Sequence, residues 1–230
     1  MSRRTAIKLQ VALAALLGST PALAADPVPV ATWNMDNDFG STMEDYSGNG
    51  NNGTLYNVVT SGGGYIFDGS SSMVIVPASP SLIPGTQDFS YTVQFQTDRV
   101  PASGMDYDLI RKGQDGTPGG GFKVELIRSN GKAVAFCRIN DSRGKSAALT
   151  DKTNLADNKL HTIKCARTGK TMTLKVDSKS SLKKRDISIQ SISNNSDVTI
   201  GAKLPDGEGP QNDWYIGVIR SAGISIAPAE

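Results

Sequence analysis

Acidic side chains gather in one short segment near the start of the chain. Asp36, Asp38, Glu44 and Asp45 place four carboxylates within ten residues. Hard oxygen ligands close together are what Ca²⁺ requires, although the spacing does not match an EF-hand loop. The segment predicts either a calcium ion held by Asp36 or Asp45 with backbone carbonyls, or a solvated acidic loop stabilised by local turns.

A second candidate site lies near the C-terminus, where Asp213, Trp214 and Tyr215 follow one another. Sugar recognition by β-sandwiches uses aromatic faces that stack on the apolar faces of sugar rings, while carboxylates bond the hydroxyl groups. We therefore predict these three residues as ligand-binding residues. Trp33 lies within an apolar segment and is expected in the core.

Residues that could perform catalysis do not form a recognisable set, and no catalytic residue is predicted. Glycoside hydrolases need two carboxylates that face each other. Glu125 and Arg128 lie close together on one candidate strand, but residues three apart on a regular strand point to opposite faces. They should not share a site unless a bulge intervenes. His161 is the only histidine and is expected to be structural.

The first residues are typical of an export signal. Arg3, Arg4 and Lys8 precede an apolar run from Leu9 to Leu17, and the small residues around Ala24 suit a signal peptidase. We predict residues 1–24 as a signal peptide and a secreted or periplasmic location for the rest. The apolar run is too short to span a bilayer, and no later segment is apolar enough, so no membrane span is expected.

Two cysteines, Cys137 and Cys165, lie in separate candidate strands. An oxidising compartment and a single even pair favour a disulfide, which we expect to join neighbouring strands. Two buried free thiols are the alternative interpretation.

Composition narrows the class of protein. The chain has 230 residues, 38% hydrophobic and 20% charged, which predicts one packed domain over residues 25–230. Because 24 basic residues nearly balance 22 acidic ones, a strongly basic nucleic-acid binder is excluded. One histidine and two cysteines exclude zinc sites built from several such ligands.

Short alternating or β-branched runs recur along the chain, separated by turn signals such as Asn130-Gly131. They predict an all-β fold, an antiparallel β-sandwich or jelly roll. Gly119-Gly120-Gly121 is expected to be a flexible loop, and the basic stretch 178–185 a solvated one. The candidate strands are Val28–Trp33, Gly64–Phe67, Met73–Val76, Phe89–Gln96, Tyr107–Lys112, Phe122–Ile127, Ala133–Ile139, Leu160–Ala166, Met172–Val176, Val198–Gly201 and Trp214–Ile219.

Several segments resemble landmarks of one family in the family's own order. They resemble bacterial laminin G-like domains of the concanavalin A-like lectin/glucanase superfamily. The landmarks in the first half are Ala31–Asp36 with Met43–Leu55, then Tyr65–Val76 with its aromatic-Asp-Gly turn, and Phe89–Val93. The later landmarks are a hairpin at His161–Arg167 and Leu174–Asp177, and an ending at Ile200-Gly201 and Tyr215–Gly217. The resemblance implies two curved antiparallel sheets. Relatives often carry an acidic calcium ligand on the last strand, but Arg220 stands near that place here and would repel calcium.

The resemblance also implies a function. It predicts a non-catalytic binding module for an extracellular carbohydrate, so the expected partner is an extracellular glycan or a cell-envelope polymer. Two alternatives stay open: a polysaccharide lyase or glycoside hydrolase of jelly-roll fold, and a protein-binding or adhesive envelope module. No cofactor other than calcium and no nucleic-acid partner are expected, and the sequence leaves the oligomeric state open.

Overall fold

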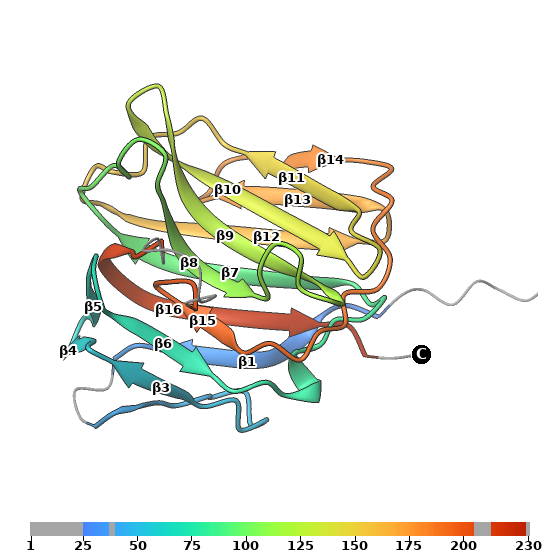
Figure 1. Ribbon diagram of the computed structural model, residues 1–230, viewed down its shortest axis with the longest axis horizontal. Helices are drawn as coiled ribbons and strands as arrows, with labels where there is room; N and C mark the ends of the chain where they lie inside the picture. The colour runs from blue at the N-terminus through green and yellow to red at the C-terminus, as the bar shows by residue number, and fades with distance from the viewer. Residues whose placement is uncertain (1–24, 37–39, 205–212, 229–230) are drawn as a thin grey trace, which may run out of the picture.

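Two antiparallel β-sheets pack face to face in this protein (Figure 1). The computed structural model describes residues 25–36, 40–204 and 213–228, and the predicted signal peptide, residues 1–24, lies outside them. Within the described residues the elements are strands and one short 3-10 helix, η1 (Pro80–Leu82). In this part of the chain no helix is long and apolar enough to cross a membrane. The prediction of an all-β sandwich is confirmed.

The first sheet, called sheet A below, has the order β14-β13-β12-β7-β16-β5-β4, and β1 pairs with β16 beside this path. Its long central strands β7, β12 and β16 form the middle of one layer. The strands of sheet A are β1 (Val28–Asn34), β4 (Val59–Ser61), β5 (Gly64–Asp68), β7 (Phe89–Gln96), β12 (Leu160–Thr168), β13 (Thr171–Val176), β14 (Leu182–Lys184) and β16 (Ile216–Ile226).

The second sheet, called sheet B, has the order β11-β10-β9-β8-β15-β6-β3-β2. Its strands β8, β9 and β15 carry the site described below. The strands of sheet B are β2 (Thr42–Met43), β3 (Gly53–Tyr56), β6 (Met73–Val76), β8 (Asp106–Lys112), β9 (Gly120–Ser129), β10 (Lys132–Asp141), β11 (Ser146–Thr150) and β15 (Val198–Ile200).

The core fills the space between the sheets, because alternate residues of each strand point inward. On β12, Ile163 and Cys165 are fully buried, whereas Lys164 between them is exposed. Trp33 is buried as predicted, and its indole N–H donates to the carbonyl oxygen of Asn51 over 2.7 Å. Because the inward-facing residues form the core, residues on the outer face of each sheet can contact ligands.

The disulfide between Cys137 and Cys165 is confirmed, but its position differs from the prediction. Cys137 lies on β10 of sheet B and Cys165 on β12 of sheet A, so the bond joins opposite sheets and not neighbouring strands. Both residues point into the core, and their Cα atoms lie 6.3 Å apart, within the range that a disulfide spans. The bond therefore fixes one layer of the sandwich to the other.

The glycine run at the start of β9 is tightly packed, so the prediction of a flexible loop there is wrong. Gly120 has φ +81°, and a Cβ atom on it would lie 2.2 Å from the carbonyl oxygen of Asn140. A Cβ on Gly119 would lie 1.9 Å from the carbonyl oxygen of Ser193. These close approaches require glycine, and they hold the turn before β9 against its neighbours.

Candidate functional site

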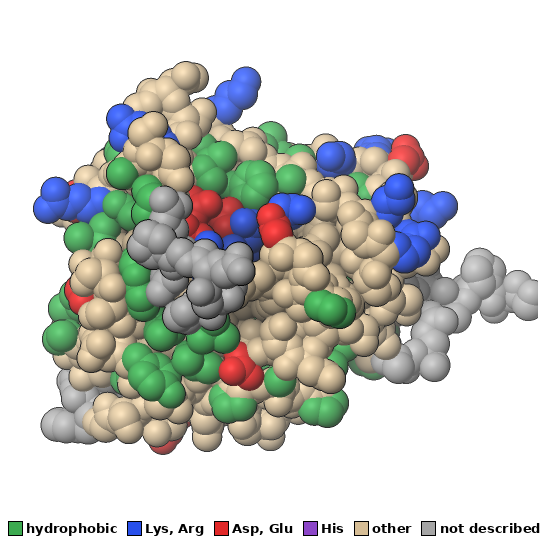
Figure 2. Space-filling model, in the orientation of Figure 1, with side chains coloured by type: hydrophobic (Ala, Val, Ile, Leu, Met, Phe, Trp, Pro, Cys, Tyr) green, Lys and Arg blue, Asp and Glu red, His purple; other side chains and the backbone are tan. Residues whose placement is uncertain are grey.

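Charged side chains are buried on the outer face of sheet B, away from the core. Asp108 is 0% exposed, Glu125 2% and Arg111 5%. Figure 2 shows acidic and basic side chains gathered near the centre of the face in view. We call the whole group the charged cluster; it consists of Asp106, Asp108, Arg111, Lys123, Glu125, Lys203 and Asp213.

A β-bulge on β8 brings the members of that strand together. Asp108 pairs with Glu125 and Ile110 with Val124, so Leu109 is an extra residue without a partner of its own on β9. Without this extra residue, Asp108 and Arg111 would point to opposite faces. With it, both side chains lie on the outer face beside Glu125.

Ion pairs connect the cluster. The Nε atom of Arg111 lies 3.0 Å from Oδ2 of Asp108, and its Nη2 atom donates to Oε1 of Glu125 over 2.9 Å. The ammonium group of Lys123 also contacts Glu125. Lys203 and Asp213 form a separate pair over 3.2 Å. Every cation of the cluster thus has a carboxylate partner.

Burial changes the acidity of two carboxyl groups. Burial, together with the negative charges of Glu125 and Asp213, raises the pKa of Asp106 from 3.8 to about 7. Burial also raises the pKa of Asp108 well above its ordinary value, although Arg111 opposes the change. Burial works against the charge of Arg111, but its carboxylate neighbours outweigh it and raise its pKa. Acid groups with shifted pKa values in a hollow are typical of functional sites.

Several buried polar atoms of this region form no hydrogen bond among the described residues. They are Oδ1 of Asp106, both carboxylate oxygens of Asp108, Nε of Arg111 and Oγ1 of Thr199. Of these, Nε of Arg111 and Oδ2 of Asp108 still contact each other as an ion pair, so the atoms without any partner are on Asp106, Thr199 and the other oxygen of Asp108. Thr199 is 2% exposed and pairs with Arg111 across β15 and β8, so the two side chains share one face. Because buried unpaired polar atoms cost stability, their concentration in one place favours a binding role.

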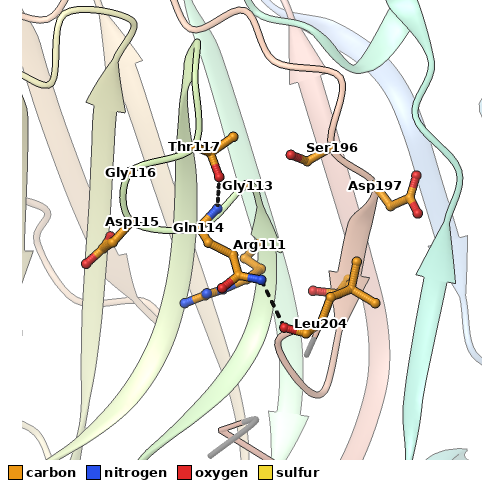
Figure 3. A pocket seen from close by; sticks show the side chains of 10 residues that line it. Arg111, Gly113, Gln114, Asp115, Gly116, Thr117, Ser196, Asp197 and Leu204 are labelled. Carbon is orange, nitrogen blue, oxygen red and sulfur yellow. Dashed lines mark hydrogen bonds between the residues drawn. The ribbon is translucent and has the colours of Figure 1, made fainter. Parts of the chain in front are cut away.

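Two adjacent hollows open above these residues. The charged hollow has a volume of about 320 Å³, and its lining includes Asp106, Lys123 and Asp213. The adjoining hollow has a volume of about 350 Å³, and its lining includes Thr199. It lies between the turn of residues 113–117 and the segment 196–204 (Figure 3). Arg111 lines both hollows and joins them.

A glutamine fixes one wall of the adjoining hollow. The Nε2 atom of Gln114 donates to the carbonyl oxygen of Leu204 over 2.9 Å, and its backbone N–H donates to Oγ1 of Thr117 over 2.7 Å. Figure 3 shows both bonds, one within the turn and one across the hollow. These two hydrogen bonds therefore fix this wall of the hollow in the protein without a ligand.

Of the three ligand-binding residues predicted near the C-terminus, only Asp213 lines a hollow. Tyr215 is fully buried, and its hydroxyl donates to the carbonyl oxygen of Gln96 over 2.7 Å. The structure thus gives Tyr215 a packing role in place of the predicted ligand contact. Trp214 is half-buried and is not part of the lining of either hollow.

The acidic segment near the start of the chain is organised around Asp45. Its Oδ1 accepts the backbone N–H groups of Thr32 and Ser47, and its Oδ2 accepts the Ser47 hydroxyl and the Asn51 N–H. These bonds use all four lone-pair positions of the carboxylate, so Asp45 does not fit a calcium site. Asp36 is exposed, and calcium binding there stays a prediction.

His161 lies on the other sheet, at the start of β12. Its Nδ1 atom lies 2.9 Å from Asp177 Oδ2, and its Nε2 atom lies 2.9 Å from Asp157 Oδ1. Both ring nitrogens are therefore engaged, which agrees with the structural role predicted for this residue.

Arg111 is the central residue that the sequence did not indicate. Glu125 and Arg128 were expected on opposite faces, and β9 keeps a regular register with β10 through both of them. The side chain of Arg128 instead donates to the carbonyl oxygen of Pro101 over 3.0 Å. The bulge lies on β8, and it supplies Arg111 as the partner of Glu125. Only the spacing of Asp108 and Arg111 could have signalled this, and that spacing is ambiguous without the bulge.

The Laminin G domain family matches residues 117–225, which confirms the resemblance drawn from the sequence. No curated protein sequence matches the chain.

Three solved structures that are similar to this chain are binding domains. The binding domain of Paraclostridial Mosquitocidal Protein 1 has a TM-score of 0.66 at 20% identity, covering 87% of this chain and 49% of that one. The binding domain of botulinum neurotoxin serotype D has a TM-score of 0.61 at 13% identity, with coverages of 88% and 49%. The binding domain of botulinum neurotoxin DC in complex with SialylT has a TM-score of 0.58 at 12% identity, with coverages of 88% and 48%. The chain spans about half the length of these structures, and the likeness shows the jelly-roll fold.

Proposed function

We propose that this chain is a non-catalytic binding module for an extracellular carbohydrate. The observation that carries the proposal is the pair of joined hollows on sheet B, where Oδ1 of Asp106 and the hydroxyl of Thr199 are buried without hydrogen-bond partners. A sugar hydroxyl both donates and accepts hydrogen bonds, so it can satisfy a carboxyl oxygen and a threonine hydroxyl alike. The laminin G family match and the binding-domain neighbours support this function.

The lining favours a hydroxyl-rich ligand over an apolar one. Gln114, Ser196 and Thr199 supply polar groups to the adjoining hollow, and Leu204 is its one large apolar side chain. Neither hollow includes an aromatic residue among its lining residues in the described part of the chain. Recognition would therefore depend on directional hydrogen bonds and not on ring stacking.

The ion pairs argue against hydrolysis. Asp106 has the raised pKa of a general acid, but glycoside hydrolysis needs a second carboxylate as base or nucleophile. Glu125 is buried between Arg111 and Lys123, and Asp213 is paired with Lys203. Neither is free for that second role, so we expect binding without turnover.

A glycan array probed with the mature chain tests the proposal. We expect a discrete set of glycans to bind, Thr199→Val to weaken them about ten-fold, and product analysis to show no cleavage. Thr173→Val, on the outer face of sheet A, is the matched control and should bind like the parent chain. An empty array, or equal binding by the Thr199 variant, would overturn the assignment to this site. New reducing or unsaturated ends would replace it with an enzymatic function.

Export and calcium are further parts of the proposal. A carbohydrate of the cell exterior requires export, and we propose cleavage after Ala24, so N-terminal sequencing of the secreted chain should begin at Ala25. A start at Met1 would contradict it. We propose that calcium, where it binds, binds through Asp36, so Asp36→Asn should abolish any Ca²⁺-dependent rise in melting temperature.

A further inference from the structure

We infer that the glycan bound here carries a free, positively charged amino group, as an unacetylated amino sugar does, and that Asp106 receives this group in the charged hollow. The inference rests on the proposed carbohydrate function and adds the chemical class of the sugar. It is argued from the balance of charges in the cluster.

The cluster lacks one cation. Its four carboxyl groups face three cations, and each cation is already engaged: Arg111 with Asp108 and Glu125, Lys123 with Glu125, and Lys203 with Asp213. Asp106 is the carboxyl group with no ion-pair partner in the described part of the chain. The neighbouring residues 205–212, whose structure is not described, contain no lysine or arginine that could supply one.

The position of Asp106 suits an incoming donor. Asp106 lines the charged hollow beside Asp213, and its Oδ1 atom is buried without a hydrogen-bond partner. An ammonium group has three N–H donors, so one group can serve Asp106 and Asp213 together. Charge-assisted hydrogen bonds of this kind are about twice as strong as neutral ones.

An organic cation fits this place better than a metal ion. No group of three or more His, Cys, Asp or Glu side chains in the described residues could hold a metal. An ammonium group needs only hydrogen-bond acceptors. Its sugar ring would lie toward the adjoining hollow, where Gln114 and Thr199 can meet hydroxyl groups. Arg111, which lines both hollows, would lie between the two ends of the ligand.

Binding would change the protonation of Asp106. The charged groups around it are Asp108, Arg111, Lys123, Glu125, Lys203 and Asp213. Burial and the negative charges of Glu125 and Asp213 leave its carboxyl group protonated at mildly acidic pH, although Lys123 opposes them. A cation placed beside it favours the ionised form, so the bound complex should release a proton. An uncharged sugar would not produce this release.

Calorimetry with two trisaccharides tests the inference. The probes are a glucosamine trimer and its N-acetylated counterpart, titrated at about pH 6 in two buffers of different ionisation enthalpy. We expect the free amine to bind about ten-fold tighter and to release a proton. Asp106→Asn should reduce the preference to about one-fold, whereas Asp98→Asn, an exposed acid outside the hollow, should keep it.

The outcomes separate the two proposals. Equal binding of both trimers without proton release overturns this inference alone. So does the result that neither trimer binds although a glycan without an amino group binds on the array. Failure of both trimers together with an empty array overturns the carbohydrate function as well. The comparison of trimers on the parent chain does not depend on the variant, and a single cooperative unfolding transition of Asp106→Asn, at or above the melting temperature of the parent, shows that the variant is folded.

Discussion

Two buried arginines, one in each sheet, are held in opposite ways. Arg167 on β12 is 2% exposed and donates only to backbone carbonyl oxygens, those of Gly85, Gln87 and Gln190. No acidic side chain forms an ion pair with it within the described residues. Burial accordingly lowers its pKa. Its hydrogen bonds connect β12 to two loops, so Arg167 stabilises one end of the sandwich.

Arg111 on β8 is surrounded by carboxylates and not by backbone carbonyl oxygens. Its partners are the carboxylates of Asp108 and Glu125, it lines two hollows, and the neighbouring Thr199 hydroxyl is buried without a hydrogen bond. Arg167 donates its hydrogen bonds to fixed backbone acceptors, and we therefore call it the architectural arginine. Arg111 lies among carboxylates at a cavity whose lining keeps unpaired polar atoms, so a ligand can still form hydrogen bonds there. This difference distinguishes the two regions.

The largest effect on the free energy of unfolding should come from replacing the architectural arginine, Arg167. Arg167→Met keeps the aliphatic stem but leaves three carbonyl oxygens without their donor, which should lower the free energy of unfolding by about 3–6 kcal/mol. Urea unfolding followed by tryptophan fluorescence measures it. Lys164→Met, exposed on the same strand, should change stability by less than about 0.5 kcal/mol. A loss below about 1 kcal/mol for Arg167→Met would break the comparison.

Removing the disulfide should have the second-largest effect on the free energy of unfolding. Replacing both Cys137 and Cys165 by alanine removes a cross-link over 28 positions, which the chain-entropy model values at about 3.5 kcal/mol. Because the bond lies in the core, glycan binding on the outer face of sheet B should stay within about two-fold. Urea unfolding and the glycan array measure the two effects. Loss of binding in a variant that is still folded would show that the core and the hollow are coupled.

The long strands could be predicted from the sequence because their periodicity extends over many residues. β6 and β7 have the predicted bounds, and β9, β10 and β12 extend them by a few residues. Of the short strands, β5, β6 and β15 were predicted, whereas β2, β3, β4, β11 and β14 were not. β14 is fully exposed and lies in a basic stretch that predicts a loop, and its pairing with β13 depends on a neighbour that only the fold supplies.

The site was harder to predict than the fold because it depends on a change of register. Asp213 was identified from its neighbours in the sequence, and it does line the charged hollow. The sequence predicts Tyr215 as a ligand-binding residue, but an aromatic residue on an inward-facing position packs in the core. Arg111 shares a face with Asp108 only through the bulge at Leu109, and a one-residue insertion in a strand leaves no reliable mark in the sequence.

Asp106 should contribute a smaller, pH-dependent effect. Its pKa is raised from 3.8 to about 7, so the folded chain binds more protons than the unfolded chain between these values. The stability of the parent chain should therefore fall as pH rises through this window. Asp106→Asn removes this contribution, so its stability relative to the parent should rise by about 1–2 kcal/mol between about pH 4 and 7, after allowance for solvent screening.

Urea unfolding of the parent and of Asp106→Asn at several pH values measures this difference. Asp98→Asn is the control, and its free energy of unfolding should vary with pH as that of the parent does. Asp108 acts in the same direction, and because the charge of Asp106 contributes to its raised pKa, the measured difference includes the part of the Asp108 shift that Asp106 causes. A constant difference across the range would show that Asp106 has an ordinary pKa. The cluster would then resemble the satisfied environment of Arg167.

The smallest effect on stability should come from Thr199→Val, although this change is expected to weaken glycan binding about ten-fold. Thr199 and Thr97 are each 2% exposed, but only the Thr97 hydroxyl is bonded, as donor to the Ile216 carbonyl and acceptor from the Arg99 N–H. Valine at 97 leaves these groups unpaired and should cost about 1–3 kcal/mol. Valine at 199 removes a hydroxyl with no partner, so its effect should lie between no change and a gain of about 1 kcal/mol. Equal losses for the two variants, measured by urea unfolding, would mean that the Thr199 hydroxyl is already satisfied and that the hollow has no free group there to offer a sugar.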